Sequence, residues 1–271
     1  MKYKIDHDYH IHSHLSVCSS DPLQTNESIL QYAIKSGLKS ICLTDHHWDE
    51  KVEKINEGWA SGFYQKQDYA YICQAKPLPQ SENVTFLFGC EAEMDMNNKI
   101  GISKERLDAF DFIIIPTTHL HMNKFSVSEA DYQNPERLAK LWIERIDALL
   151  DMDLPFYKIG LAHPVCILMN NASEEAYLST IELINKDEMR RIWKKAAIKG
   201  LGIEINAEDV YRIIKYKAVC DVFRMAKECG CKFYLGSDAH HPVNFENCIR
   251  QFERAIELLN LEESDKFYIG K

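Results

Sequence analysis

The stretch Asp8-Tyr9-His10-Ile11-His12 decides the fold of this chain. It ends the first apolar run, residues 3–11, and side chains alternate along a strand, so His10 and His12 would lie on one face. Two imidazoles on one face can hold one metal ion. A lone His-X-His pair on a half-exposed strand is as often two solvated residues, and the rest of the chain decides between these interpretations.

Six further short apolar runs follow, and each ends in a polar cluster. We expect these strands at residues 38–43, 84–89, 110–116, 157–162, 201–205 and 232–236. Helical patterns separate most of them, beginning at the cap Thr25 and Ser28 and continuing at 135–150, 186–199, 215–228 and 244–259. Seven parallel strands covered by helices form an α/β arrangement that brings the carboxyl ends of all strands to one rim.

Residues 48–82 do not fit this alternation. They are rich in aromatic and charged residues and close with Pro77 and Pro79. An insertion directly after a strand end can act as a lid over a site. A packed helical excursion with no contact to substrate fits the same pattern, and both interpretations stay open.

Composition and charge limit the class of protein. The 271 residues, 46% hydrophobic and 27% charged, fit one soluble domain spanning 1–271. The net charge is −9 and no basic run occurs, which makes a nucleic-acid partner unlikely and leaves a small phosphorylated molecule compatible. Composition says nothing about the oligomeric state.

The nine cysteines are dispersed, with no Cys-X-X-Cys pair, and are typical of reduced thiols in a cytoplasmic protein. The first six residues lack the apolar core of a signal peptide, and no apolar run approaches membrane-spanning length. We therefore expect a cytoplasmic location and no membrane partner.

Histidines give the strongest signal. There are eleven, and all except His7 fall at or just beyond an expected strand end; Asp45, Glu91 and Asp238 follow the same rule. Histidine with carboxylate suits zinc, manganese or iron. So many ligands at one rim exceed what one tetrahedral ion needs, which favours two or three divalent ions sharing a bridging carboxylate.

These residues carry a family resemblance. The chain resembles the polymerase and histidinol phosphatase (PHP) family through Asp8-X-His10-X-His12, Thr44-Asp45-His46, Gly89-X-Glu91, His119, His163-Pro164, Glu204-X-Asn206 and Ser237-Asp238-Ala239-His240. The resemblance runs from residue 8 to residue 240, with the motifs in the family's order.

The resemblance implies a distorted (βα)7 TIM-like barrel with the metal site at the C-terminal ends of its strands. One ion would be held by His10, His12, Glu91 and Asp238. A second would be held by Glu91, His119 and His163, and a third by His46 and His240. At a position where some members place another ligand of that third ion, this chain has Cys18, which is either a thiolate ligand or a buried thiol.

The resemblance also suggests roles beyond the ligands. Glu91, Asp238 and His240 are the expected catalytic residues, and phosphate requires a cation outside the metal shell, for which Arg212 comes first and Lys124 second. His47 is expected to contact substrate, and His14, His47 and His121 are candidate proton shuttles. Asp45 is expected to orient a ligating imidazole, and Glu93 is either directed to the site or solvated.

The expected function is metal-dependent hydrolysis of a small phosphomonoester by a metal-bridging hydroxide, with histidinol phosphate as the leading substrate. Three alternatives remain: a nucleotide or oligonucleotide phosphoesterase, an amidohydrolase-like metal hydrolase, and a metal-binding module without turnover. The acidic charge balance argues against the nucleic-acid substrate.

Overall fold

The computed structural model describes residues 1–19 and 21–270, and it shows a nearly closed barrel of seven parallel strands. The strands follow one another in the order β1 (His7–Ile11), β2 (Ser40–Leu43), β4 (Thr85–Ala92), β5 (Phe112–Ile115), β6 (Ile159–Leu161), β7 (Gly202–Asn206) and β8 (Lys232–Gly236). A two-residue strand, β3 (His46–His47), pairs with the end of β4. The predicted α/β barrel is confirmed.

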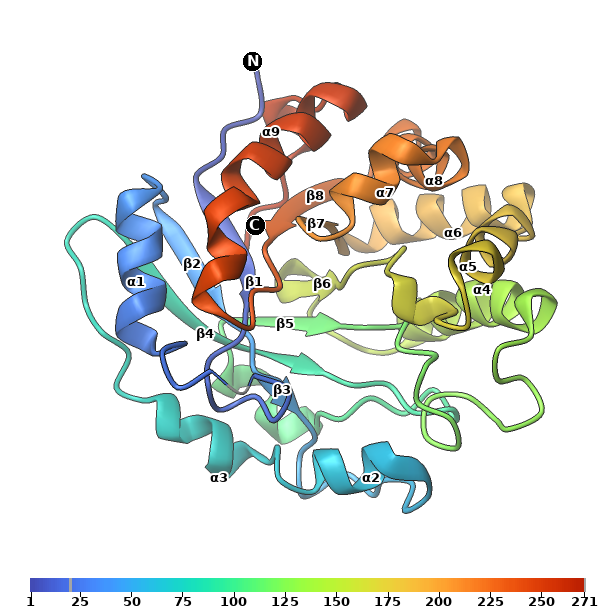
Figure 1. Ribbon diagram of the computed structural model, residues 1–271, viewed down its shortest axis with the longest axis horizontal. Helices are drawn as coiled ribbons and strands as arrows, with labels where there is room; N and C mark the ends of the chain where they lie inside the picture. Colours follow the sequence, from blue (N-terminus) through green and yellow to red (C-terminus); the bar gives the residue numbers. More distant parts are fainter. Residues whose placement is uncertain (20, 271) are drawn as a thin grey trace.

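Helices surround the strands in Figure 1. They are α1 (Asn26–Lys35), α2 (Gly58–Tyr64), α3 (Tyr69–Ile72), α4 (Pro135–Asp151), α5 (Glu174–Glu182), α6 (Lys186–Lys199), α7 (Val210–Lys215), α8 (Lys217–Glu228) and α9 (Cys248–Leu259). Side-chain caps define several ends: Asn185 accepts the N–H groups of residues 187 and 188, and Gly200, with φ 78°, ends α6 in the left-handed conformation. None of the helices in residues 1–19 and 21–270 is long and apolar enough to cross a bilayer.

Some elements differ from the sequence-based prediction. β4 continues to Ala92, so Glu91 belongs to the strand and not to the loop after it. The helix expected at 215–228 begins only at Lys217, because Tyr216 adopts an extended backbone that separates α7 from α8. α5 was not predicted, although Ser173 caps it and two glutamates occupy its first turn.

Apolar side chains of the strands fill the barrel interior. Phe112 and Ile114 of β5 face inward with Tyr234 of β8, while their neighbours Ile113 and Ile115 belong to the outer core beneath the helices. A Cβ at position 160 would lie 2.7 Å from the Phe112 and Tyr234 rings, so glycine is required there. Apolar rings thus occupy the interior, and the polar site is confined to the carboxyl ends of the strands.

The seam between the first and last strands is joined in a distinctive way. The Leu235 N–H donates to Nε2 of His7 (3.1 Å), and the Ser237 N–H donates to Oδ1 of Asp8 (2.9 Å). Just past the strand ends, the Asp238 N–H donates to the carbonyl of His10 at 2.7 Å. Side-chain acceptors of β1 therefore replace part of the backbone hydrogen bonding that joins the other strands.

Candidate metal centre

Glu91 lies at the centre of a cluster of imidazoles. Pairing of β3 with β4 puts His46 opposite Glu91, and His46 Nδ1 lies 2.8 Å from Glu91 Oε2. On the other side, His163 Nε2 lies 3.0 Å from Glu91 Oε1. Each oxygen of Glu91 thus faces an imidazole nitrogen. Glu91 is only 1% exposed, so the site is shielded from water.

A second group joins the two edges of the barrel. The Nε2 atoms of His10 and His12 are 2.9 Å apart, and Oδ1 of Asp238 lies 3.3 Å from each of them. Alternation along β1 brings the two imidazoles to one face, and the turn after β8 adds the carboxylate. His10, His12 and Asp238 form one set of converging ligand atoms; His10, Glu91 and His163 form another, and His12, His46 and His240 a third.

The outer nitrogens of the two β1 imidazoles are both hydrogen-bonded. His10 Nδ1 lies 2.8 Å from Oε1 of the fully buried Glu204, a carboxylate that can only accept. His12 Nδ1 lies 2.9 Å from the Ser16 hydroxyl, which donates its own proton to Asp45 Oδ1 (2.7 Å) and so accepts from the ring. In both rings Nδ1 therefore carries a proton, and Nε2 is the nitrogen available to a metal ion.

Two further imidazoles also have Nδ1 within hydrogen-bonding distance of an acceptor. His119 Nδ1 lies 2.7 Å from Oε2 of the buried Glu93, which also accepts the hydroxyl proton of Tyr64 at 2.7 Å. His240 Nδ1 lies 2.8 Å from the carbonyl of Asp238. Metal-ligating histidines usually donate their second N–H to a carboxylate or carbonyl in this manner.

This donor set fits divalent cations. Two imidazole lone pairs that face each other at 2.9 Å, beside a carboxylate, repel unless positive charge lies among them. Histidine nitrogens and carboxylate oxygens are suitable ligands for zinc, manganese or iron. The residues present therefore match a metal centre with more than one ion.

The charges of the site reinforce one another. Burial raises the pKa of Glu91, but the positive charge of the protonated His46 and His10 rings outweighs it and holds that pKa well below its ordinary value. Burial likewise opposes ionisation of Asp238, and His10 and His12 lower its pKa well below the usual range. Both carboxylates are therefore anionic at neutral pH, as ligands must be.

The backbone is strained at two of these positions. His163 and Asp238 have positive φ angles, 27° and 56°, which side-chain-bearing residues seldom adopt. Each follows a strand end and turns its side chain back over the barrel. Strain of this kind is retained where the surrounding structure fixes it, often at functional sites.

His119 and Cys18 lie at the edge of the cluster. His119 Nε2 is 4.0 Å from Glu91 Oε1, and its ring stacks on His163 with centroids 4.8 Å apart. The Cys18 residue is exposed at the pocket; burial of its thiol raises the pKa, but the adjacent His46 and His240 rings prevail and lower it to about 6. The structure thus brings every predicted ligand to one rim, with these two outermost.

A pocket of about 170 Å³ opens onto this cluster. It is lined by site residues and by five apolar or aromatic residues: Trp59, Phe63, Tyr64, Met122 and Leu168. His121 also lines it, and burial together with His119 and His46 lowers the pKa of His121 to about 3. Among the described residues that line the pocket there is no lysine or arginine.

The three residues predicted to bind substrate lie elsewhere, and this corrects the sequence-based expectation. His47 is fully buried on the opposite side of β3 from His46, against Phe110 and Tyr69, because adjacent residues of a strand face opposite sides. Arg212 pairs with Asp209 (3.1 Å), and Lys124 with Glu129 (3.0 Å) on the surface.

Two histidines that were candidate proton shuttles or neighbours of the motifs are also outside the pocket. His14 is exposed and its Nδ1 lies 3.3 Å from the carbonyl of Gln24, while His241 faces Asp21 at 3.7 Å. Asp45 was expected to contact a ligating imidazole directly, and it does not. It accepts the hydroxyl proton of Ser16, and that hydroxyl in turn accepts the ring N–H of His12.

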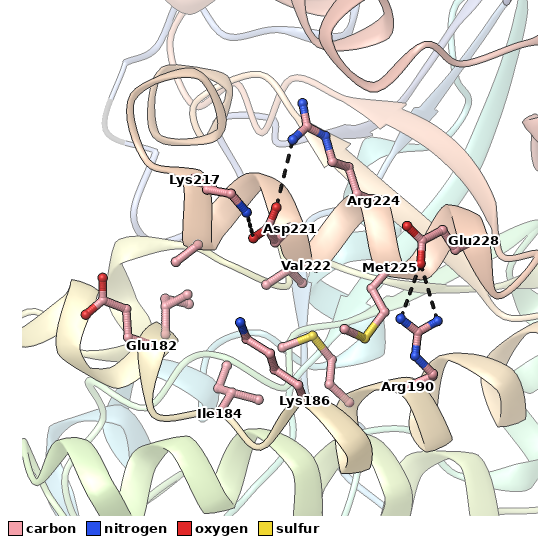
Figure 2. Close-up of a pocket in the computed structure, with 13 residues that line it drawn as sticks. Glu182, Ile184, Lys186, Arg190, Lys217, Asp221, Val222, Arg224, Met225 and Glu228 are labelled. Carbon is pink, nitrogen blue, oxygen red and sulfur yellow. Dashed lines mark hydrogen bonds and ion pairs between the residues drawn. The ribbon is translucent and has the colours of Figure 1, made fainter.

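A larger hollow of about 450 Å³ lies outside the barrel, between α5, α6 and α8 (Figure 2). Its charged side chains are largely paired with one another: Lys217 with Asp221, and Arg190 with Glu228 at 3.3 Å. It contains none of the converging ligand atoms, so its size alone does not make it the functional site.

Comparison with known proteins is consistent with this geometry. Residues 8–208 match the PHP domain family. The chain belongs to the PHP family. A probable phosphatase of Caldicellulosiruptor bescii is 27% identical over 240 residues, 88% of this chain and 81% of the relative. A probable phosphatase of Caldanaerobacter subterraneus is 25% identical over 263 residues, 96% of this chain and 84% of the relative.

Solved structures share the PHP barrel. The histidinol phosphate phosphatase of Lactococcus lactis, determined with zinc, L-histidinol and phosphate, superposes with a TM-score of 0.54 and 17% identity, covering 94% of this chain and 92% of the other. A putative histidinol phosphatase of Listeria monocytogenes gives the same TM-score at 13% identity, covering 91% and 99%. At such identities the likeness extends to the fold alone.

The sequence did not reveal which residues hold the ligands in place. For Glu93 the sequence left open whether the side chain is directed to the site or solvated, and the structure places it buried against His119. Glu204 belongs to a recognised motif, but nothing local connects it to His10, 194 residues away. Tyr64 and Ser16 gave no signal, because hydroxyl residues in loops and insertions are common.

Proposed function

We propose that this PHP protein is a metal-dependent phosphomonoesterase that converts histidinol phosphate to histidinol and phosphate. The observation that carries the proposal is the convergence of imidazole Nε2 lone pairs on Asp238 and Glu91, with the opposite ring nitrogens held by acceptors. Relatives that align over most of the chain are probable phosphatases, and a protein of the same fold binds zinc, histidinol and phosphate.

We assign the ligands as follows. His10, His12 and Asp238 would hold one ion, Glu91 would bridge it to a second near His119 and His163, and His46 with His240 would hold a third, with Cys18 beside them. Two or three divalent ions, zinc, manganese or iron, would supply activation of water and positive charge on the phosphoryl oxygens. No lysine or arginine lines the described pocket, so the phosphate charge has no other strong partner there.

The protein side chains have narrower tasks. Glu91, Asp238 and His240 fix the reacting centre, and Glu204, Ser16 and Glu93 fix the tautomer and direction of the imidazoles. Burial and the neighbouring imidazoles lower the pKa of His121 to about 3, so at pH 7 its ring is neutral and can form a hydrogen bond to a leaving group but is not the cationic acid that would protonate it. The leaving oxygen would therefore be protonated by water.

The size of the pocket favours a small substrate. About 170 Å³ beside the ligand cluster is enough for a compact ester, whereas a nucleic-acid strand needs a long cationic groove. An oligonucleotide substrate therefore remains the weaker alternative.

The test is phosphate release from histidinol phosphate, sugar phosphates and nucleotides, with added zinc or manganese and with a chelator. We expect chelator-sensitive release that is highest for histidinol phosphate. Glu91→Gln should abolish turnover and reduce bound metal, and full activity in that variant would contradict the bridging role. Cys18→Ser should reduce the metal content by at most one ion; unchanged stoichiometry would show that Cys18 is not a ligand.

A further inference from the structure

The apolar side of the pocket is built by a helix of the insertion. Trp59 and Phe63 are four residues apart on α2, so both project from the same face of that helix toward the site. The Phe63 ring lies 5.3 Å from the ring of His46, and Trp59 lies 5.6 Å from His121. The aromatic wall, Trp59 with Phe63, therefore lies directly beside the candidate ligands and lines the same cavity.

The wall is held rigidly in place. Gly58 has φ 72°, and a Cβ there would overlap the carbonyl of Asn123, so glycine lets α2 approach that loop closely. Tyr64, the next residue after Phe63, is buried and donates its hydroxyl proton to Glu93. The insertion is thus packed against the barrel and also lines the pocket.

Trp59 is unusual among the tryptophans. It is 56% exposed, whereas Trp48, Trp142 and Trp193 are at most 2% exposed. Binding surfaces keep large aromatic rings exposed beside a pocket, because a ligand that covers such a ring releases water and gains contact area.

We propose that this aromatic wall is the subsite for the ring of the leaving group, so that Trp59 and Phe63 are specificity-determining residues. The inference rests on the proposed phosphatase function and adds the residues that select the substrate. The rings of Trp59 and Phe63 are perpendicular, 90° at 6.3 Å, and form a corner. A flat ring placed there stacks on one face and meets the edge of the other, which is the favoured geometry of aromatic pairs.

Other leaving groups lack this match. A sugar or ribose carries hydroxyls that need partners, and the wall is formed by apolar carbon surfaces with Met122 and Leu168 beside them. An alkyl chain gains contact area but not the ring geometry. The imidazole of histidinol belongs to the class that fits, and so does a phenyl ring.

The experiment compares three phosphate esters on the metal-loaded enzyme: histidinol phosphate, phenethyl phosphate and butyl phosphate. In Trp59→Leu we expect KM for the two ring-bearing esters to rise about two- to tenfold, with kcat/KM for butyl phosphate within about twofold of the wild type. Phe63→Leu should behave similarly, and Trp59→Phe should restore much of the loss. Tyr157→Leu is the matched control, since Tyr157 is 51% exposed and precedes β6 at the opposite end of the barrel.

Binding gives a second measurement that does not depend on turnover. Phenylphosphonate should change the tryptophan fluorescence of the wild type and of Tyr157→Leu, but not that of Trp59→Leu, because the other three tryptophans are buried. Equal losses for all three esters in Trp59→Leu, or an unchanged KM, would overturn the aromatic subsite while leaving the phosphatase proposal intact. A wild type that hydrolyses none of the three would overturn the proposed function, and with it this inference.

Discussion

Replacing Glu204 with glutamine removes one negative charge from a fully buried position and leaves the shape of the side chain nearly unchanged. In the wild type, Oε1 lies 2.8 Å from His10 Nδ1, and Oε2 accepts the backbone N–H of His163 at 2.5 Å. Glutamine has one acceptor oxygen for these two donors. If its oxygen turns to His163, its NH2 group faces His10 and favours the tautomer with the proton on Nε2, where it obstructs a ligand position.

The size of the effect follows from these contacts. Either one buried donor loses its partner, which costs about 1–3 kcal/mol of unfolding free energy, or His10 changes its tautomer. Loss of the acceptor that orients a ligating imidazole lowers metal affinity about ten- to a hundredfold, or about 1.4–2.7 kcal/mol. We therefore expect Glu204→Gln to fold, to be moderately less stable, and to bind metal more weakly by at least tenfold.

The assay is competition for zinc with a chromophoric chelator at fixed pH and ionic strength, alongside urea unfolding. Glu253→Gln is the matched control, because it removes the same charge from an exposed carboxylate on α9, outside the pocket and the converging ligand sets. Wild-type affinity in Glu204→Gln would refute the reasoning. Equal weakening in both variants would also refute it, since a general change in charge would then suffice.

Two further predictions concern groups outside the ligand cluster. Burial raises the pKa of Asp209 to about 7, so the folded protein holds this proton between about pH 4 and pH 7 and its stability contribution is lost as pH rises through that window. Asp209→Asn should therefore gain up to about 4 kcal/mol of unfolding free energy relative to the wild type between pH 4 and pH 8, measured by denaturant titration; a difference independent of pH would contradict this. Arg145 is buried and donates to four carbonyls, those of Thr117, Asp95, Ser126 and Met94, at 2.8 to 3.0 Å. A lysine ammonium cannot reach all four carbonyls, so the free energy of unfolding of Arg145→Lys should be lower than that of the wild type by about 3 kcal/mol or more, measured by thermal or chemical unfolding. An unfolding midpoint equal to that of the wild type would show that the guanidinium contacts are dispensable.

The barrel and the convergence of the candidate ligands at one rim were predictable because their determinants are local. Each strand is a short apolar run, and each ligand lies at its carboxyl end, so parallel packing alone gathers them. α6 and β8 have the predicted bounds for the same reason, since caps or polar residues flank a continuous pattern.

Long-range contacts limited the rest. His46 and His47 are chemically identical neighbours, and only the pairing of β3 with β4 decides which of them faces the site. Arg212 and Lys124 were assigned from the resemblance and from residue type, but Arg212 pairs with the buried Asp209 and Lys124 with Glu129 on the surface, and the sequence identifies neither partner. The aromatic wall is likewise invisible in sequence, because it depends on how an insertion folds back across the barrel mouth.

The side-chain joints between β1 and β8 have a consequence for how this barrel would come apart. His10 and His12 belong to β1 at one edge of the sheet, and Asp238 and His240 directly follow β8 at the other edge. Bound ions would therefore link the first strand to the last. An enzyme stripped of its ions would open along this line as an unrolled sheet, exposing two strand edges of the kind that recruit other chains into aggregates. Loss of the cofactor and loss of colloidal stability would then be a single event, and retention of the ions would govern the lifetime of the protein as well as its catalysis.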